Sequence, residues 1–133
     1  MLSVKIEEPK HKVNDVIKKQ GASATTVHLF ETFLNEIKSS LGRQGKTVKF
    51  RSHIYGVTAF CSEHKAFMFV NVWKNFVSTL YFTGKGKIPG LAKKNWLTGT
   101  DNEGSETYRI TDEMTLKSAL AYASVAWDLA SRN

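Results

Sequence analysis

The chain has 133 residues, of which 41% are hydrophobic and 23% are charged. This length suffices for one domain with a hydrophobic core but not for two, and the composition excludes a disordered or collagen-like chain. A single cysteine, Cys61, excludes a disulfide framework and a multi-cysteine metal site. No apolar run approaches the roughly 20 residues of a membrane span, and the acidic start does not resemble a signal peptide. We therefore expect a cytoplasmic domain without a membrane segment.

The positive charge is concentrated in the middle of the chain. The formal net charge is +7, yet residues 37–100 contain eleven basic residues and one acidic residue, Glu63, whereas residues 101–133 are net acidic. A basic segment of this kind attracts an anionic partner such as nucleic acid, a nucleotide or an acidic protein surface. A net positive charge also keeps a small domain in solution without any such partner, so charge alone leaves both interpretations open.

Residues 1–25 are predicted to form a polar N-terminal arm, and residues 26–133 a single α+β domain. Within the arm, Val13, Val16 and Ile17 favour a short helix that ends near Gly21. We expect this arm to be loosely held or to dock as that short helix.

The stretch 26–41 has the clearest periodicity of the chain. Its apolar residues recur every three or four positions, which predicts an amphipathic helix with one buried stripe. Thr25 or Thr26 is expected to cap its start, and Gly42 to follow its end. The stripe consists of Val27, Phe30, Phe33, Leu34, Ile37 and Leu41.

From residue 46 to 83 the period changes to two, which predicts β-structure. Lys49, Arg51 and His53 alternate with apolar or small residues, so the first strand should have one basic, solvated face. The chain is expected to continue extended from 54 to 60, with a bulge at Gly56. Residues 66–73 are almost entirely apolar and predict a central strand, and 76–82 predict the next strand. Turns at 62–65 and 74–75 would join these strands into an antiparallel meander.

A glycine-rich and lysine-rich loop is predicted at 83–104, followed by a strand at Glu106–Ile110 and a helix at 112–131. Thr111 or Asp112 should cap this helix. We expect Leu120 and Trp127 to pack on the sheet beneath the first helix. Together the elements predict an α+β two-layer sandwich, in which N- and C-terminal helices pack on an antiparallel sheet of four to five strands. The buried stripe of the last helix is predicted as Leu116, Leu120, Ala123 and Trp127.

The segment Tyr108–Glu113 leads into Leu116, Ala119 and Leu120 and then into the pair Ala126–Trp127. This segment resembles the C-terminal signature of a bacterial family of domains of unknown function. These domains occur alone or at the C-terminus of proteins labelled predicted transport proteins. The resemblance covers roughly residues 26–130 and implies a similar fold. Its motifs are structural, so it implies no catalytic residues and no membrane segment.

Three local patterns were weighed as sites of chemistry. Cys61 and His64 are close in sequence, but a thiol ending a strand need not meet an imidazole in the following turn. The histidines, His11, His28, His53 and His64, show no metal-ligand spacing; His28 and Glu31 lie one helical turn apart, which is common on helix surfaces. The run Gly84-Lys-Gly-Lys87 fits neither a P-loop nor a dinucleotide-binding turn. We predict no catalytic residues, no metal and no cofactor.

Two main hypotheses of function follow. The first is a non-enzymatic binding module for a polyanion such as nucleic acid. Most aromatic residues are expected in the core, and no motif of two exposed aromatics on adjacent strands is apparent. The second is a protein-interaction or homodimerisation module, with a small-molecule binder as a further alternative. In the first hypothesis, phosphates contact Lys49, Arg51, Lys85, Lys87, Lys93 and Lys94, and bases stack on Trp96 and Tyr55.

Overall fold

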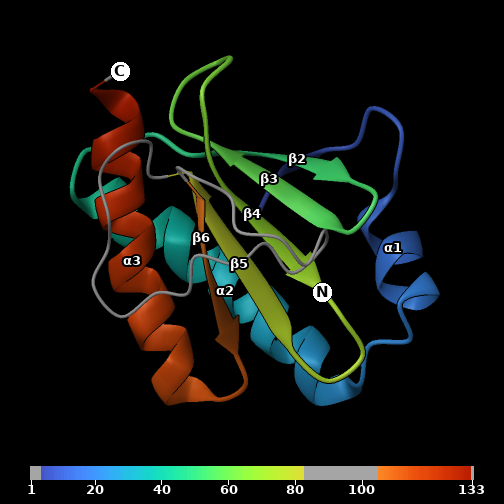
Figure 1. The fold of residues 1–133 in the computed structure, drawn as a ribbon. Helices are drawn as coiled ribbons and strands as arrows, with labels where there is room; N and C mark the ends of the chain where they lie inside the picture. The colour runs from blue at the N-terminus through green and yellow to red at the C-terminus, as the bar shows by residue number, and fades with distance from the viewer. Residues whose placement is uncertain (1–3, 83–104, 133) are drawn as a thin grey trace.

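The α+β architecture predicted from the sequence is confirmed in a computed structural model, which describes residues 4–82 and 105–132 (Figure 1). This part of the chain forms one sheet and three helices. The elements are, in order, β1 (Ile6–Glu7), α1 (Val13–Lys19), α2 (Ala24–Arg43), β2 (Lys49–His53), β3 (Gly56–Phe60), β4 (Ala66–Val72), β5 (Val77–Phe82), β6 (Ser105–Ile110) and α3 (Glu113–Ser131).

The strands lie in the sheet in the order in which they occur in the sequence. β2 to β6 form an antiparallel meander, and β1 pairs in parallel with β2. The described sheet is therefore mixed and six-stranded, so the expectation of a purely antiparallel sheet of four to five strands was wrong in these two respects. β1 has only two residues, which is too short for an alternating pattern to be recognised.

The segment 54–60 also differs from its prediction. Ile54 and Tyr55 form a two-residue turn, so β2 and β3 are a hairpin rather than one extended run. Gly56 is paired with Asn71, and the irregularity in the register lies between Ala59 and Phe60 instead. The glycine is required because its backbone passes close to the carbonyl of Val70, where a side chain would not fit.

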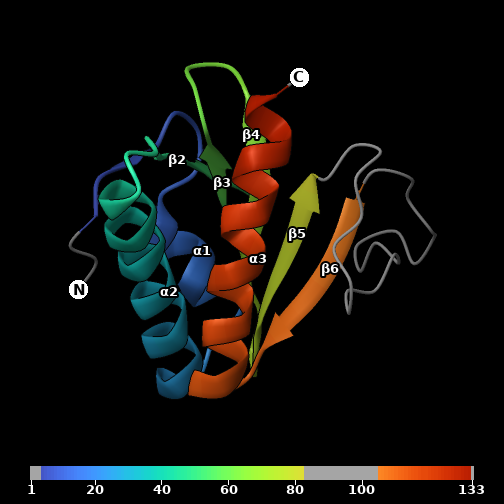
Figure 2. The same ribbon diagram turned by 90° about the vertical axis from the view of Figure 1, so that its left-hand side faces the viewer.

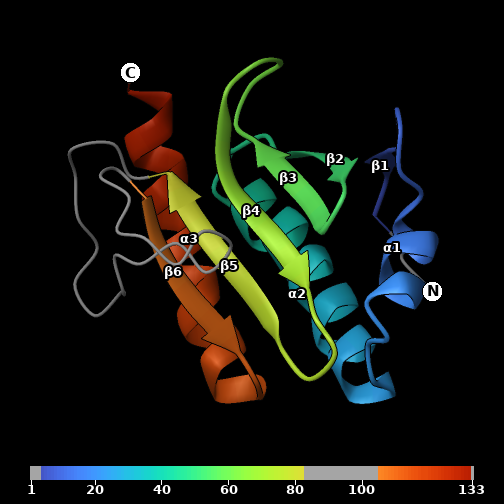
Figure 3. The same ribbon diagram turned by 45° about the vertical axis from the view of Figure 1, so that its right-hand side comes forward.

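Helices α2 and α3 pack side by side on one face of the sheet (Figures 2 and 3). The stripe predicted for α2 is buried there apart from Val27, which is only partly buried, and Leu29 joins it. The helix starts earlier than predicted, because the Ser23 hydroxyl caps it by accepting the Thr26 N–H at 3.1 Å. It also continues through Gly42, so that residue does not mark its end.

The buried stripe of α3 is rotated from the predicted one. Leu120 and Trp127 pack against the core cluster but are only partly buried, because small residues face the sheet between them. Alanines in this stripe let the helix approach the sheet and α2 closely. The predicted cap is confirmed: the Asp112 carboxylate accepts the Thr115 N–H at 2.8 Å, which lowers the pKa of that carboxyl. The buried residues are Leu116, Ala119, Ala123, Ala126 and Ala130.

The N-terminal segment docks against the core through α1. Val13 and Val16 are buried in the same hydrophobic cluster as the sheet and the larger helices. The Glu8 carboxylate accepts the Val13 N–H at 2.6 Å, and the Ser52 hydroxyl donates to the His11 carbonyl. The short helix expected near Gln20 is thus present and tied to β2.

Among the helices that the structure describes, none combines the length and the apolarity needed to cross a bilayer.

Candidate functional site

The face of the sheet opposite α2 and α3 carries six partly exposed aromatic rings, three from strands and three from the turns that join them. Side chains alternate between the two faces of a strand, and the strand register therefore assigns every second residue to this face. We call it the aromatic face. It consists of Lys49, Arg51, His53, Tyr55, Thr58, Phe60, Phe69, Asn71, Trp73, Phe76, Ser78, Leu80, Phe82, Thr107 and Arg109.

Every aromatic ring on this face is partly exposed, whereas the residues between them are more deeply buried. Asn71, Ser78, Leu80 and Thr107 each have an exposed fraction below 5%. Because their neighbours are buried and ordered, these rings lose little conformational freedom when a ligand binds. This lowers the entropic cost of binding compared with mobile side chains. The rings are Tyr55, Phe60, Phe69, Trp73, Phe76 and Phe82.

Three of the rings form a group at the centre and at one end of the face. The Arg51 guanidinium lies 4.8 Å from the ring centroid of Phe60, a cation–π distance. The His53 ring is 4.9 Å from Phe69, and Phe69 meets Phe82 edge to face at 4.8 Å. Neighbouring strands therefore offer a row of rings flanked by cationic or ionisable groups.

A second group lies where β4 turns into β5. The Trp73 ring is 5.4 Å from Tyr55 and 6.5 Å from Phe76. The Arg109 guanidinium lies 4.3 Å from the Phe76 ring centroid. Ser78 holds the indole in place, because its hydroxyl accepts the Trp73 Nε1–H at 2.8 Å. This group repeats, on other strands, the pairing of a guanidinium with a ring.

His53 is the one imidazole on the aromatic face, and it is held from both sides. Its Nε2 lies 2.7 Å from the Asn71 Oδ1, and its Nδ1 lies 3.0 Å from the Thr58 hydroxyl. Burial lowers the pKa of His53 below its ordinary value, and the nearby His11 lowers it further, while the Asn71 hydrogen bond opposes this shift. The ring is thereby held in a fixed orientation against Phe69.

Two of the cationic residues form ion pairs whose distances are long for a salt bridge. The Lys49 ammonium lies 4.0 Å from the Glu63 carboxylate, and the Arg51 guanidinium lies 3.9 Å from the Glu7 carboxylate. All four side chains are more than a third exposed. Exposed ion pairs at such distances contribute little free energy. A phosphate that replaces either carboxylate would therefore meet a small energetic barrier.

Of the residues predicted to contact a polyanion, the structure brings Lys49, Arg51 and Tyr55 together on the aromatic face. The basic, solvated face predicted for the first strand is confirmed, since Val48, Phe50 and Ser52 are buried on its other side. The other predicted residues, Lys85, Lys87, Lys93, Lys94 and Trp96, lie outside the described residues.

Sequence reasoning missed most of the aromatic face. It placed most aromatics in the core, but among the aromatics of residues 55–82 only Phe67 and Tyr81 are fully buried. It also found no pair of exposed aromatics on adjacent strands, whereas Phe60 and Phe69 form one. The available signal was the period-two spacing of the aromatics after residue 50. The missed residues are Phe60, Phe69, Trp73, Phe76, Phe82 and Arg109.

Neither the Cys61–His64 pair nor the histidines form an arrangement that supports catalysis or metal binding in the described residues. Cys61 is buried with an 8% exposed fraction, its thiol donates to the Lys65 carbonyl, and burial raises the pKa of the thiol. His64 is exposed in the turn that follows. Within residues 4–82 and 105–132, no three His, Cys, Asp or Glu side chains gather as a metal site would require.

Comparison with known proteins identifies no relative: no family model, curated protein or solved structure matches the chain. The resemblance to the bacterial family of domains of unknown function therefore stays a prediction, and a proposal of function has to rest on the aromatic face.

Proposed function

We propose that the aromatic face binds single-stranded nucleic acid. The observation that supports this most directly is the repeated pairing of a guanidinium with a ring, Arg51 with Phe60 and Arg109 with Phe76. A row of partly exposed rings offers stacking surfaces for bases, and the cations beside the rings offer contacts for the phosphates between them. The proposal is a binding role without a catalytic step.

The charge around this face favours a polyanion over an apolar partner. The residues of this face include three permanent cations, Lys49, Arg51 and Arg109, and no acidic residue. Association with a strand of phosphates would gain free energy from released counterions, in proportion to the number of phosphates contacted. An apolar partner would gain nothing from these cations.

Unpaired bases fit the geometry better than a duplex does. Stacking on aromatic rings requires bases that are not already stacked in a helix, and it tolerates any base because every base has a π-face. His53 and Asn71 lie in the middle of the row and carry polar groups next to the Phe69 ring. Both ring nitrogens of His53 are engaged by Thr58 and Asn71, so we expect this imidazole to act on the nucleic acid through its charge.

The test is a titration of a short fluorescent oligodeoxythymidine and an oligouridine with the full chain, followed by fluorescence anisotropy at several salt concentrations. At low salt we expect dissociation constants of about 1–100 µM, and the affinity should fall steeply as salt is added. The variant Arg51→Gln/Arg109→Gln should weaken binding and reduce the log–log salt slope by about 1.4, or 0.7 for each lost phosphate contact. Phe60→Ala should cost about 1–3 kcal/mol of binding free energy if a base stacks on this ring.

The matched control is Arg43→Gln/Lys117→Gln, which removes two charges from α2 and α3. Thermal unfolding should verify that each variant is folded. An equal loss of affinity in the control would show that binding depends only on the net charge of the protein, and it would contradict the proposal. Absence of a complex at about 100 µM protein in low salt would reject it as well, since even non-specific binding is tighter than this. Self-association that persists in high salt would favour the alternative of homodimerisation through the same face.

A further inference from the structure

A second group of cations lines a cavity beside the turn of the β2–β3 hairpin. The cavity has a volume of about 310 Å³ and lies between α1 and the turn of the β2–β3 hairpin. Lys10, His11, Lys12 and Lys19 line it, together with Val16 and Ile54. We propose that this cavity is a binding site for the phosphate group of a small phosphate monoester, separate from the aromatic face.

The walls of the cavity are held in place without a ligand. The Glu8 carboxylate fixes the start of α1 through the Val13 N–H, and the Ser52 hydroxyl fixes the His11 carbonyl. Val16 anchors the helix in the core with an exposed fraction of 5%. Because this backbone is already ordered, a ligand need only immobilise the lysine side chains, and this keeps the entropic cost of binding low.

The residues that line the cavity carry an excess of positive charge. Its three lysines are exposed, and no residue in the described part of the chain forms a salt bridge with any of them. Asp15 is the one acidic residue among those lining the cavity. Nearby Glu7 lies beside Arg51, and Glu8 is engaged by the backbone of α1. Three ammonium groups facing one carboxylate leave about two positive charges, which matches a phosphate monoester dianion.

The size and the lining limit the rest of the ligand. A volume of about 310 Å³ is at the lower end of the range for small-molecule sites, so it fits a mononucleotide or a sugar phosphate. Ile54 has an exposed fraction of 45% and, with Val16, offers apolar surface beside the lysines. The phosphate would meet the ammonium groups, and the organic part would lie against these two aliphatic side chains.

Isothermal titration calorimetry and amide chemical shifts provide the test, with inorganic phosphate, adenosine monophosphate and adenosine as separate probes. We expect saturable binding of adenosine monophosphate with shifts in residues 10–19 and at Ile54, weaker binding of inorganic phosphate, and none of adenosine. Binding of phosphate equal to that of the nucleotide would identify the free anion as the ligand, and still support the site. Binding of adenosine alone, or no saturable binding of any probe, would overturn it.

The triple variant Lys10→Gln/Lys12→Gln/Lys19→Gln should weaken phosphate binding by about tenfold or more, because it removes all three ammonium groups. The control Lys18→Gln/Lys117→Gln/Arg132→Gln makes the same change in net charge at exposed positions that do not line the cavity. Equal losses in the two triple variants would overturn the proposal. The aromatic-face variant Arg51→Gln/Arg109→Gln should leave phosphate binding unchanged, so failure of one site is distinguishable from failure of the other.

Discussion

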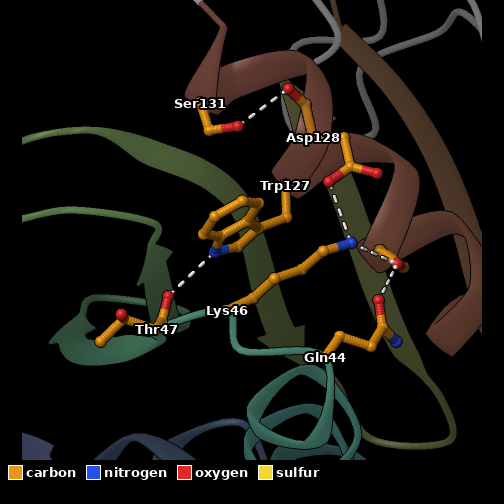
Figure 4. Close-up of polar contacts among 7 residues, drawn as sticks. Gln44, Lys46, Thr47, Trp127, Asp128 and Ser131 are labelled. Atoms are coloured by element: carbon orange, nitrogen blue, oxygen red, sulfur yellow. Dashed lines mark hydrogen bonds and ion pairs between the residues drawn. The ribbon is translucent and has the colours of Figure 1, made fainter.

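The Lys46 ammonium lies 2.9 Å from the Asp128 carboxylate, and it joins the connection between α2 and β2 to the last turns of α3 (Figure 4). It also donates to the Ser124 hydroxyl at 3.1 Å and lies 5.5 Å from the ring centroid of Trp127. The indole Nε1–H of Trp127 donates to the Thr47 carbonyl at 2.9 Å, so adjacent residues of the connection are held by the same helix. These contacts fix the end of α3 against the rest of the protein.

Replacing Lys46 should therefore destabilise the protein. The Lys46 side chain is 15% exposed and that of Asp128 is 41% exposed, so the pair is partly screened. For Lys46→Met we expect the free energy of unfolding to fall by about 1 kcal/mol. Lys49→Met is the matched control, because its Glu63 partner is 4.0 Å away and both side chains are exposed; it should change stability by less than about 0.5 kcal/mol. Urea unfolding measures both, and equal effects would contradict the asymmetry between these two ion pairs.

Gly56 should tolerate no side chain. A Cβ at this position would overlap the carbonyl oxygen of Val70 on the neighbouring strand, and both belong to backbone that the sheet holds rigidly. We expect Gly56→Ala to lower the free energy of unfolding by about 2 kcal/mol or more, or to prevent folding.

The matched substitution is Gly42→Ala. Gly42 lies within α2, and a Cβ there would meet nothing within 4 Å. Alanine forms helices better than glycine, so this variant should stabilise the protein by about 0.5–1 kcal/mol. Thermal unfolding of the two variants should give midpoints on opposite sides of the wild type. A midpoint of Gly56→Ala equal to the wild type would show that the β2–β3 hairpin does not pack as described.

Alkaline solution should unfold the protein through Tyr81. This side chain is fully buried, and its hydroxyl donates to the Ala119 carbonyl of α3 at 3.0 Å. Burial raises the pKa of Tyr81 above its ordinary value of 10, so above this pH the unfolded chain loses a proton that the folded chain keeps. The free energy of unfolding should consequently fall as the pH rises above about 10. Denaturant unfolding at pH 9 to 11 measures this, and Tyr81→Phe should flatten the decline while Tyr55→Phe, at a partly exposed ring, should not.

The elements with strong local patterns were predictable from the sequence. The 3.6-residue stripe of α2, the apolar run of β4 and the Asp112 cap of α3 all depend on neighbouring residues, so sequence alone identifies them. The β1 strand was not predictable, because two residues carry no period and its partner, β2, lies more than forty residues away.

The aromatic face could be predicted only in part, for a different physical reason. Alternation reveals which residues share a face of a strand, but not which face the helices cover. In β4 and β5 both faces are apolar, so a ring such as Phe69 or Phe82 resembles a core residue as closely as Phe67 does. The packing of α2 and α3 on one side determines which face of the sheet is buried. This packing depends on contacts between residues far apart in the chain.

His53 supplies a pH dependence that links stability to the proposed binding. Its folded-state pKa lies below the ordinary value of 6.5, so near that pH the unfolded chain binds a proton that the folded chain does not. The free energy of unfolding should therefore fall as the pH drops from about 6.5 through the folded-state pKa. On the aromatic face, the same protonation adds a positive charge, and nucleic-acid affinity should rise over this interval because the added charge attracts phosphates. Anisotropy titrations between pH 7.5 and 5.5, in the range where the protein remains folded, measure this rise.

Two single variants isolate the contribution of this imidazole from those of the other histidines. His53→Gln retains a hydrogen-bonding partner for Asn71 but cannot become cationic, so its affinity should depend less on pH than that of the wild type. His64→Gln removes an imidazole from the exposed turn between β3 and β4, and should leave the wild-type dependence on pH intact. If His53→Gln follows the wild-type curve, then the nucleic acid does not meet the centre of the aromatic face, and contacts to Arg51 and Arg109 alone would have to account for binding.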